Sequence, residues 1–369
     1  MKLAIVHDWL TGMRGGEKCL EVLCALYPEA DLFTLVHVPG SVSPVIERRR
    51  ITTSFAQRLP SVDRFYRYYL PLFPFAIERF DLHGYDLIVS FSHCVAKSVV
   101  RPPGTRHLCY CFTPMRYAWD QFDAYFGPER VGRVASAALR PVMAGLARWD
   151  RATAGRVDRY LAISQHVANR IASHYNRPST VVYPPVDTTF YLPDGTRPGS
   201  HALIVSALVP YKRIEIAIDA CRRAGVPLRI VGAGPDRPRL EAAAGGDVTF
   251  LGRLPDEAVR DEYRRAGVVL LPGEEDFGIV PVEAQACGRP VVALGRGGAT
   301  ETVVDGVTGV LVADDGPAAF ADGVRQAMRT SFDASRIRAH AERFARERYA
   351  AALAAAMQET MAMSPGDAW

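Results

Sequence analysis

The chain has 369 residues and a formal net charge of +4, and 49% of its residues are hydrophobic while 23% are charged. This composition excludes a disordered or fibrous protein, and the length predicts two domains. The small positive charge favours anionic partners, but the basic residues lack the dense clustering of a nucleic-acid-binding motif, so no nucleic acid is expected.

The N-terminal apolar run is interrupted by Asp8 and is followed by no cleavage site, so we expect no signal peptide. No later run reaches the roughly 18 apolar residues of a spanning helix. The seven cysteines include no C-x-x-C pair, which predicts reduced structural thiols in a cytoplasmic protein.

Short apolar runs alternate with helical patterns along the first half of the chain. We expect strands at residues 2–9, 31–37, 86–92, 105–112, 159–164 and 180–184. The helical pattern of Glu17–Leu26 follows a glycine loop, and residues 128–157 read as one long helix interrupted by Pro141. Continuous apolar strands that alternate with helices predict a parallel sheet covered on both faces.

A Pro/Gly-rich stretch at 183–200 separates this region from a second, more regular alternation of strands and helices. We therefore predict an α/β protein with two doubly wound parallel sheets, divided into residues 1–187 and 188–344. One long amphipathic helix is expected over about 335–361.

The segment EDFGIVPVE joins the end of a predicted strand to a predicted helix start near Ile279. Backbone N–H groups at a helix start suit an anion, and the carboxylates of Glu275 and Glu283 suit vicinal sugar hydroxyls. Two solvated glutamates are the plain alternative for such a pair.

This segment and its continuation through Gly297-Gly298 and ETVVDGVTGVLV resemble the E-x₇-E signature of retaining glycosyltransferases of the GT-B fold, family 4. The match covers most of 200–315 and weakens through the N-terminal half. The resemblance implies two Rossmann-like domains that face a cleft, with the C-terminal helix (about 345–369) returning to the first domain.

For the donor, the resemblance implies that Glu275 binds sugar hydroxyls and Glu283 the nucleotide ribose. The amides of four residues would face the sugar and the diphosphate: Phe277, Gly278, Ile279 and Val280. Leu254 falls where the main chain of the family meets the base, although a core leucine is the plain reading.

Lys212 matches a family lysine that neutralises charge on the leaving diphosphate, although a surface lysine at a helix start is the alternative. The arginine that accompanies it in the family is replaced by Ala207, which leaves Arg213 or Arg253 as substitutes. Gly232 and Gly234 lack the third glycine of a dinucleotide fingerprint, so a tight turn near the base is the better account.

In the N-terminal half, Gly15 and Gly16 open a helix whose amides would approach the donor, or simply form a tight turn. Asp8 ends the first strand and is expected to bind an acceptor hydroxyl. His93 follows another strand in a loop that resembles the S-x-S-H loop of the family, which implies that it hydrogen-bonds the transferred sugar. A structural histidine is the alternative.

The run CYCFTPMRYAWD resembles a branch of the family that transfers sugars, often mannose, onto polyprenyl-diphosphate-linked glycans, although relatives often carry His in place of Phe112. It implies acceptor contacts for Arg116, Tyr117, Trp119 and Asp120, with core packing as the alternative for the aromatic residues. Residues 54–80 mix arginines with aromatic residues, which favours peripheral contact with the anionic inner face of the cytoplasmic membrane, or else a packed helix hairpin.

With this resemblance, the sequence predicts a retaining glycosyltransferase that acts in surface polysaccharide assembly. Its donor would be a nucleotide-diphosphate sugar, with GDP-mannose as the first choice, and its acceptor a lipid-linked oligosaccharide. Its catalytic residues would be His93, Lys212 and Glu275. No D-x-D metal site and no carboxylate nucleophile is evident, which favours front-face attack without a metal or another cofactor. The alternatives are a UDP-sugar-dependent transferase with another acceptor and a nucleotide-sugar-binding subunit without catalysis. The sequence shows neither the additional acids that an epimerase would need nor the cofactor lysine that a phosphorylase would need.

Overall fold

The computed structural model describes residues 1–363, and the chain divides into two compact units. Unit 1 contains Met1–Pro184 together with the segment from Tyr349 onward, and unit 2 contains Pro185–Arg348. The last residues of the expected C-terminal helix, 364–369, lie outside the described residues.

Unit 1 is built on a parallel sheet with the strand order β3-β2-β1-β4-β5-β6-β7. Its strands are β1 (Leu3–His7), β2 (Asp31–Thr34), β3 (Ile51–Thr53), β4 (Leu87–Ser92), β5 (Arg106–Cys111), β6 (Arg159–Ala162) and β7 (Thr180–Val181). His7 is in register with Thr34 on one side and with Phe91 on the other, so β1 is an interior strand between β2 and β4.

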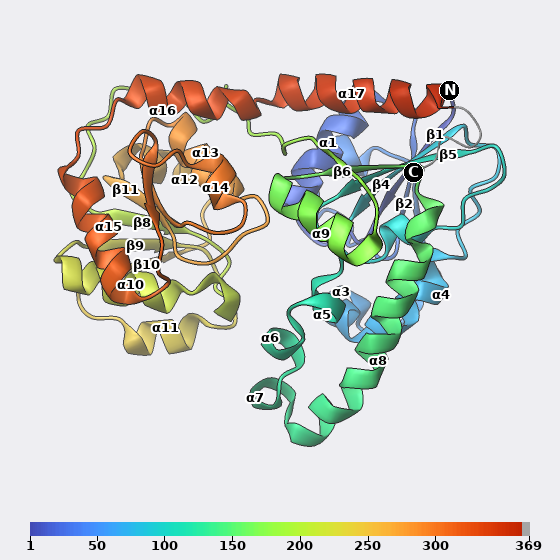
Figure 1. Cartoon of the computed structure of the whole chain (residues 1–369), viewed down its shortest axis with the longest axis horizontal. Helices are drawn as coiled ribbons and strands as arrows, with labels where there is room; N and C mark the ends of the chain where they lie inside the picture. The colour runs from blue at the N-terminus through green and yellow to red at the C-terminus, as the bar shows by residue number, and fades with distance from the viewer. Residues whose placement is uncertain (364–369) are drawn as a thin grey trace. The chain divides into compact units, whose positions relative to one another are not determined.

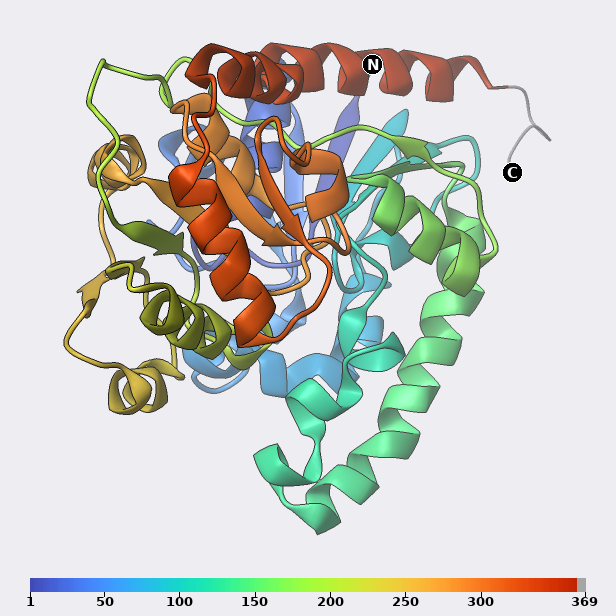
Figure 2. The same cartoon turned by 60° about the vertical axis from the view of Figure 1, so that its left-hand side comes forward.

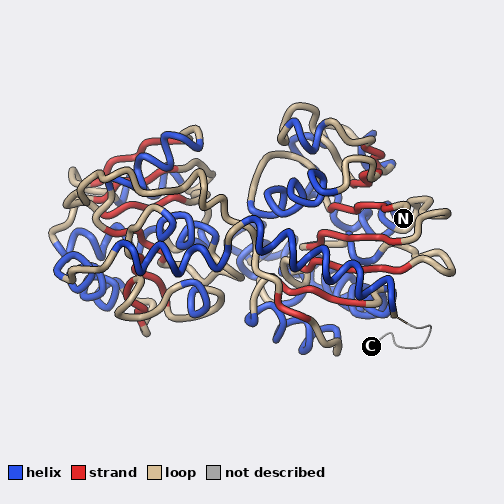
Figure 3. The backbone as a smooth tube through the Cα atoms, turned by 90° about the horizontal axis from the view of Figure 1, so that it is seen from above, coloured by secondary structure: helices blue, strands red, loops and turns tan. Residues whose placement is uncertain are grey.

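Unit 2 repeats the architecture with the strand order β10-β9-β8-β11-β12-β13. Its strands are β8 (Ala202–Val205), β9 (Leu228–Val231), β10 (Val248–Gly252), β11 (Val268–Leu271), β12 (Val291–Leu294) and β13 (Gly309–Val312). Figure 3 shows the strands of each sheet side by side. The predicted fold class, two doubly wound parallel sheets, is confirmed.

Helices cover the sheets of both units, which explains why strands such as β1, β4 and β11 are buried along their whole length. Apart from the C-terminal helix, the helices of unit 1 are α1 (Gly15–Leu26), α2 (Pro44–Glu47), α3 (Val62–Phe65), α4 (Phe73–Ile77), α5 (Arg116–Trp119), α6 (Phe122–Phe126), α7 (Pro128–Val131), α8 (Arg133–Ala152) and α9 (Gln165–Tyr175). Those of unit 2 are α10 (Ile214–Ala224), α11 (Arg237–Ala243), α12 (Asp256–Arg265), α13 (Ile279–Ala286), α14 (Ala299–Thr302), α15 (Pro317–Arg329) and α16 (Ala334–Ala341).

The expected break at Pro141 is wrong, because Pro141 lies inside the continuous helix α8. The chain breaks instead at Gly132, whose φ of +83° is a left-handed conformation that favours glycine. Figures 1 and 2 show α8 extending away from the sheet of unit 1, with α7 near its outer end. The helix tolerates the proline because only one backbone hydrogen bond is lost in a long, largely exposed element.

The expected single helix over 335–361 is also corrected. It is two helices, α16 and α17 (Arg346–Ala362), separated by a 3₁₀ turn over Glu342–Phe344 and by an extended Ala345. Beyond this break Tyr349 is buried in unit 1, where its ring meets that of Tyr110 at 5.4 Å. All seven cysteines are buried free thiols.

His107 on β5 gives the core of unit 1 a pH-dependent stability. It is fully buried; its Nδ1 lies 3.1 Å from the Arg156 carbonyl oxygen and its Nε2 lies 2.8 Å from Ser90 Oγ, which fits a neutral ring. Burial lowers the pKa of His107 to about 3. A base whose pKa falls on folding stabilises the protein above its unfolded pKa near 6.5, and this contribution is lost as the pH falls toward 3.

We expect acidification from pH 7 to pH 5 to remove about 2 kcal/mol of unfolding free energy through His107 alone. Urea unfolding at both pH values measures this loss. The variant His107→Asn should be less stable at pH 7 but should lose less on acidification than the wild type does. The exposed His83 offers a matched control, since His83→Asn should leave the difference between the two pH values unchanged. An equal loss in the wild type and in His107→Asn would contradict the assignment.

Candidate active site

In a doubly wound sheet, ligands bind beyond the carboxyl ends of the strands where the strand order reverses. In unit 2 this point lies between β8 and β11. The chain leaves β8 toward Lys212, the last residue of a short 3₁₀ helix over Pro210–Lys212, and leaves β11 toward Glu275. Two of the residues that the sequence singled out for donor chemistry, Lys212 and Glu275, therefore meet at the switch point of unit 2.

Lys212 and Glu275 form an ion pair in which Nζ contacts Oε1. Their side chains keep 19% and 16% of their exposure, so both are accessible to a ligand while partly shielded from water. Gly273 allows the loop after β11 to approach the backbone of Tyr211 and Lys212 closely, because a Cβ on Gly273 would lie 2.8 Å from the Tyr211 carbonyl oxygen. The arrangement offers one cation and one carboxylate side by side.

The N-terminus of α13 lies directly after this pair. Gly278 stands at the helix cap with a φ of +88°, and Ile279 and Val280 begin the helix. The Gly297-Gly298 turn fixes this loop from the side, because a Cβ on Gly298 would lie 2.3 Å from Phe277 Cα. The resulting row of helix-start amides carries the partial positive charge that suits a phosphate.

Glu283 lies within α13 and is only 5% exposed. The hydroxyl of the fully buried Tyr263 on α12 donates to Glu283 Oε2 at 2.9 Å. Tyr263 thus fixes one carboxylate oxygen of the residue expected to bind the ribose. Sequence reasoning missed Tyr263, because a tyrosine in an amphipathic helix carries no signal beyond core packing.

The two arginines expected to substitute for the missing one have other surroundings. Arg213 pairs with Glu215 and Asp315, while Arg253 is exposed after β10, two strands from β8. The half-buried Leu254 follows Arg253.

Gly232 and Gly234 of unit 2 serve a close backbone approach. A Cβ at these positions would lie 1.8 Å from the Ser206 carbonyl oxygen and 2.1 Å from that of Leu208. These two glycines are therefore required where the β9 loop packs against the segment after β8 that contains Ala207.

The switch point of unit 1 lies between β1 and β4, which end at His7 and Ser92. Asp8 follows β1, and its fully buried carboxylate accepts four consecutive backbone N–H groups from the loop after β4, at 2.7 to 2.9 Å. The donors are His93, Cys94, Val95 and Ala96. The acceptor contact expected for Asp8 is corrected accordingly: the side chain is inaccessible, and it holds the loop that carries His93.

His93 Nδ1 lies 3.1 Å from Asp8 Oδ2, and the indole of Trp9 meets the imidazole edge-on at 4.4 Å. Burial raises the pKa of Asp8, but the charge of His93 and hydrogen bonds from its side chain and backbone outweigh burial and bring the pKa to about 2. The ionised Asp8 fixes the ring so that Nδ1 faces the carboxylate, which leaves Nε2 for a ligand. The side chain of His93 is 27% exposed.

Gly15 and Gly16 form the first turn of α1, at the same edge of the unit 1 sheet. A Cβ on Gly16 would lie 3.3 Å from the ring of Phe112 and 3.7 Å from His7 Nε2. The helix start is thus packed against the residues that surround His93, since the ring of Phe112 lies 6.2 Å from that of His93.

The polar groups expected to contact an acceptor already have partners within unit 1. Trp119 Nε1 donates to Asp150 Oδ2 at 2.8 Å, and Asp120 pairs with Arg170 and with His174. Tyr117 is half-buried with its ring edge-on to Tyr125, and Arg116 is half-buried at the start of α5. Asp150, which the sequence pattern did not single out, is the side chain that holds Trp119.

Comparisons with known proteins match both halves of the chain. Residues 13–190 match the model of Glycosyltransferase Family 4, and residues 199–330 match that of Glycosyl transferases group 1. A D-inositol 3-phosphate glycosyltransferase of Geodermatophilus obscurus is 31% identical over 61% of this chain and 59% of its own length. One of Kribbella flavida is 35% identical over 45% and 47%. The chain thus spans about half of the length of the curated relatives it matches.

Solved structures share the fold at low sequence identity. HepE of Anabaena, solved in complex with UDP, has a TM-score of 0.70 at 19% identity, over 97% of this chain and 100% of that one. Sucrose-phosphate synthase from Thermosynechococcus elongatus has a TM-score of 0.72 at 20% identity, over 99% and 100%. With two family models that between them span both sheets, the chain belongs to the group 1, family 4 glycosyltransferases of the GT-B fold.

Proposed function

We propose that this protein is a retaining glycosyltransferase that moves a sugar onto a polyprenyl-diphosphate-linked oligosaccharide. The sugar proposed is mannose, and the donor is GDP-mannose. The observation that carries the proposal is the Lys212–Glu275 pair at the switch point of unit 2, beside the N-terminus of α13. A cation, helix-start amides and a carboxylate in one place match the diphosphate and the sugar hydroxyls of a nucleotide-sugar donor.

Donor binding is proposed to exchange the partners of this pair. Lys212 turns to the diphosphate, and Glu275 is released to accept hydrogen bonds from the hydroxyls of the sugar. The amides of Phe277 to Val280 bind the phosphate oxygens, and Glu283, oriented by Tyr263, binds the ribose. Until the donor binds, each of these two groups balances the charge of the other, because an unpaired charge in a site that is partly shielded from water would cost free energy.

The proposed reaction is front-face displacement at C1 of the sugar. The bond from C1 to the oxygen of the leaving diphosphate breaks, the acceptor oxygen forms its bond on the same face, and its proton passes to the leaving phosphate. Lys212 and the α13 amides stabilise the charge that develops on that phosphate. His93, oriented by Asp8, is proposed to hydrogen-bond the sugar.

A thermal-shift screen of the full chain against GDP-mannose, GDP, UDP-glucose and UDP tests the donor. A ligand at 100 times its dissociation constant adds about 2.7 kcal/mol of stability, which is readily measured. A larger shift with GDP-mannose than with UDP-glucose supports the proposal. A second candidate, a UDP-sugar-dependent transferase with an acceptor such as an inositol phosphate, is favoured by the UDP complexes of the fold neighbours and by the names of the relatives. The reverse order of shifts would overturn GDP-mannose as the donor in favour of a UDP-sugar.

Two further assays separate a transferase from a binding subunit and test the absence of a metal. Slow release of free sugar from the bound donor supports an enzyme, whereas binding without release favours a non-catalytic subunit. Because helix amides and Lys212 supply the positive charge at the proposed phosphate site, donor binding should be unchanged in EDTA. A loss of binding in EDTA would overturn the metal-free proposal.

We also propose peripheral contact between residues 54–80 and an anionic membrane surface. The structure forms this segment from short helices, and no helix among the described residues is both long and apolar enough to cross a membrane. Tyr68 is 80% exposed and Phe75 61%, while Phe73 and Leu70 are buried beneath them in the core of unit 1. Exposed arginines flank these rings: Arg58, Arg64, Arg67 and Arg79. Exposed aromatic rings among arginines suit the headgroup region of an anionic bilayer.

Flotation with vesicles that contain phosphatidylglycerol should recover the wild-type chain, and recovery should fall with rising salt because surface electrostatics are screened. The variant Tyr68→Ser/Phe75→Ser should float several-fold less while remaining folded, since both side chains are exposed. The equally exposed Val134→Ser, on α8, serves as a control. Equal flotation of all three chains, or no flotation of the wild type, would refute the contact.

A further inference from the structure

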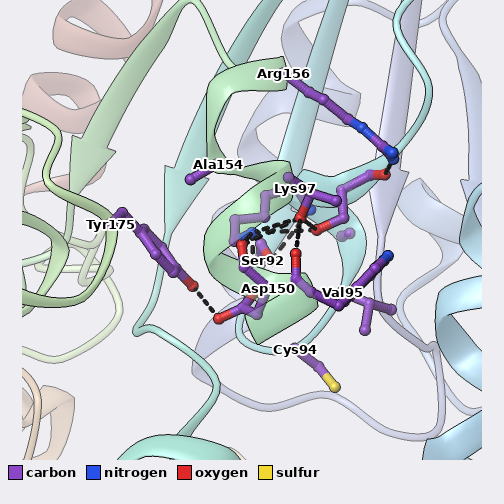
Figure 4. Close-up of polar contacts among 12 residues, drawn as sticks. Ser92, Cys94, Val95, Lys97, Asp150, Ala154, Arg156 and Tyr175 are labelled. Carbon is purple, nitrogen blue, oxygen red and sulfur yellow. Dashed lines mark hydrogen bonds and ion pairs between the residues drawn. The ribbon is translucent and has the colours of Figure 1, made fainter. Parts of the chain in front are cut away.

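Unit 1 contains a buried ion pair that the proposed chemistry does not use. Lys97 is 1% exposed and Asp150 is not exposed at all, and Lys97 Nζ lies 2.9 Å from Asp150 Oδ1. Figure 4 shows the lysine reaching from the loop after β4 to the end of α8. Burying two charges costs several kcal/mol per ion, and apolar residues of similar size often give equal stability. Stability alone therefore does not account for this pair.

The ammonium of Lys97 fastens the distal end of the loop that carries His93. It donates to the Asp150 carbonyl oxygen at 2.6 Å and to Ser98 Oγ at 3.1 Å, at the C-terminal end of α8, where the helix dipole favours a cation. Ser98 adds a contact of its own, since its hydroxyl lies 2.7 Å from Thr153 Oγ1. Asp8 already holds the proximal end of this loop through four N–H groups.

The second carboxylate oxygen of Asp150 holds the segment expected to contact the acceptor. Oδ2 accepts from Trp119 Nε1 at 2.8 Å and from the Tyr175 hydroxyl at 2.9 Å. The indole of Trp119 also stacks on His174, with the ring centres 4.5 Å apart. One buried carboxylate thus connects the His93 loop, α5 and α9.

We propose that Asp150, with Lys97 as its counter-ion, is a positioning residue that sets the His93 loop and Trp119 relative to one another. The inference rests on the proposed function for its catalytic consequence, because His93 matters only if it meets the sugar. A carboxylate suits the task, since one oxygen pairs with the cation of one element while the other accepts from two further elements. A neutral side chain cannot bind three elements with comparable strength.

The test is the neutralised pair Lys97→Met/Asp150→Asn in the full chain, assayed for hydrolysis of GDP-mannose and UDP-glucose. We expect kcat to fall about tenfold or more, because small displacements of a catalytic group are costly. The donor KM should stay within about twofold, because the proposed donor residues lie in unit 2. Unfolded chains would also lower the apparent kcat at unchanged KM, so kcat is normalised to the folded fraction of each variant, measured by circular dichroism.

Asp158→Asn provides the matched structural control. Asp158 is a buried carboxylate of unit 1 that also pairs with a cation, Arg101, and accepts a backbone N–H from His107, but it lies at the amino end of β5. We expect it to lower stability and to leave kcat unchanged. Equal losses of kcat in both variants, or a folded neutralised pair with wild-type kcat, would overturn the proposal.

A second readout holds even if the proposed function fails. The indole N–H resonance of Trp119, assigned by its loss in Trp119→Phe, should move in the neutralised pair and stay in place in Asp158→Asn. An unmoved resonance overturns the positioning role. A wild-type chain that neither binds nor hydrolyses a nucleotide sugar refutes the proposed function instead, while the resonance still reports on Asp150.

Discussion

Replacing Lys212 by Met should lower sugar transfer or donor hydrolysis by about 100-fold to 1000-fold, because it removes a cation at the point where charge develops on the leaving diphosphate. It also leaves Glu275 unpaired where an anionic ligand is to bind. We therefore expect the affinity for the bare nucleoside diphosphate to fall as well. Steady-state kinetics and calorimetric titration measure the two effects separately.

Glu275→Gln should affect the affinity for the bare nucleoside diphosphate and the affinity for the nucleotide sugar in different ways, which distinguishes the role of Glu275 from that of Lys212. Removing the carboxylate takes away the negative charge that pairs with Lys212 and repels the diphosphate, so a nucleoside diphosphate without sugar should bind as tightly as to the wild type or more tightly. The nucleotide sugar should show no such increase in affinity, because its sugar hydroxyls lose a charged hydrogen-bond acceptor. Arg223→Met, which removes an exposed arginine paired with Asp219 on α10, is the control and should change neither affinity. Full transfer by Lys212→Met would contradict the donor site.

The C-terminal unit could be predicted closely because its information is local. Each strand ends within a few residues of the group it positions, so spacing alone placed Glu275 after β11 and the helix start at Ile279. The order of the strands then brings Lys212 and Glu275 to one switch point. Their ion pair was not predictable, because it depends on the rotamers of two side chains that are 63 residues apart in the sequence.

Helix breaks were predicted less well, because they depend on backbone conformation. The helical stretch over 128–157 was expected to be interrupted at Pro141, yet the interruption lies at the left-handed Gly132, between α7 and α8. The break between α16 and α17 carries no glycine or proline, since it lies in the run Glu342–Ala345. Tertiary packing of Phe344 and Tyr349, both buried, decides such a break, and no local pattern reports it.

The N-terminal unit resists prediction because its decisive contacts are distant in sequence and involve ordinary residue types. Asp8 and His93 were both singled out, but as separate ligands, whereas they are 85 residues apart and joined by hydrogen bonds. Neither Lys97 nor Asp150 was singled out from the sequence, because they fall within apolar or helical patterns. Only the fold shows that they are buried and paired.

Asp8→Asn should destabilise unit 1 by about 2 to 5 kcal/mol, because a buried carboxylate that accepts four N–H groups becomes neutral and one of its oxygens is replaced by an NH₂ group, which cannot accept. Because the pKa of Asp8 is near 2, below its ordinary 3.8, the stability that this carboxylate contributes also depends on pH. A carboxyl whose pKa falls on folding stabilises the protein above pH 3.8, and this contribution is lost as the pH falls toward 2. The wild type should therefore lose stability over that interval more steeply than Asp8→Asn.

The same variant should lower transfer by about 100-fold or more, because the loop that holds His93 loses its anchor and the imidazole loses the partner that fixes its Nδ1. His93→Asn separates the two consequences, since it removes the imidazole but keeps the four backbone N–H groups on Asp8, so it should lower kcat while costing less stability than Asp8→Asn. The exposed Asp86→Asn is the control and should change neither property. If Asp8→Asn were as stable as the wild type in urea, the four hydrogen bonds would not hold the loop; if it were unstable but fully active, the loop would not carry a catalytic group.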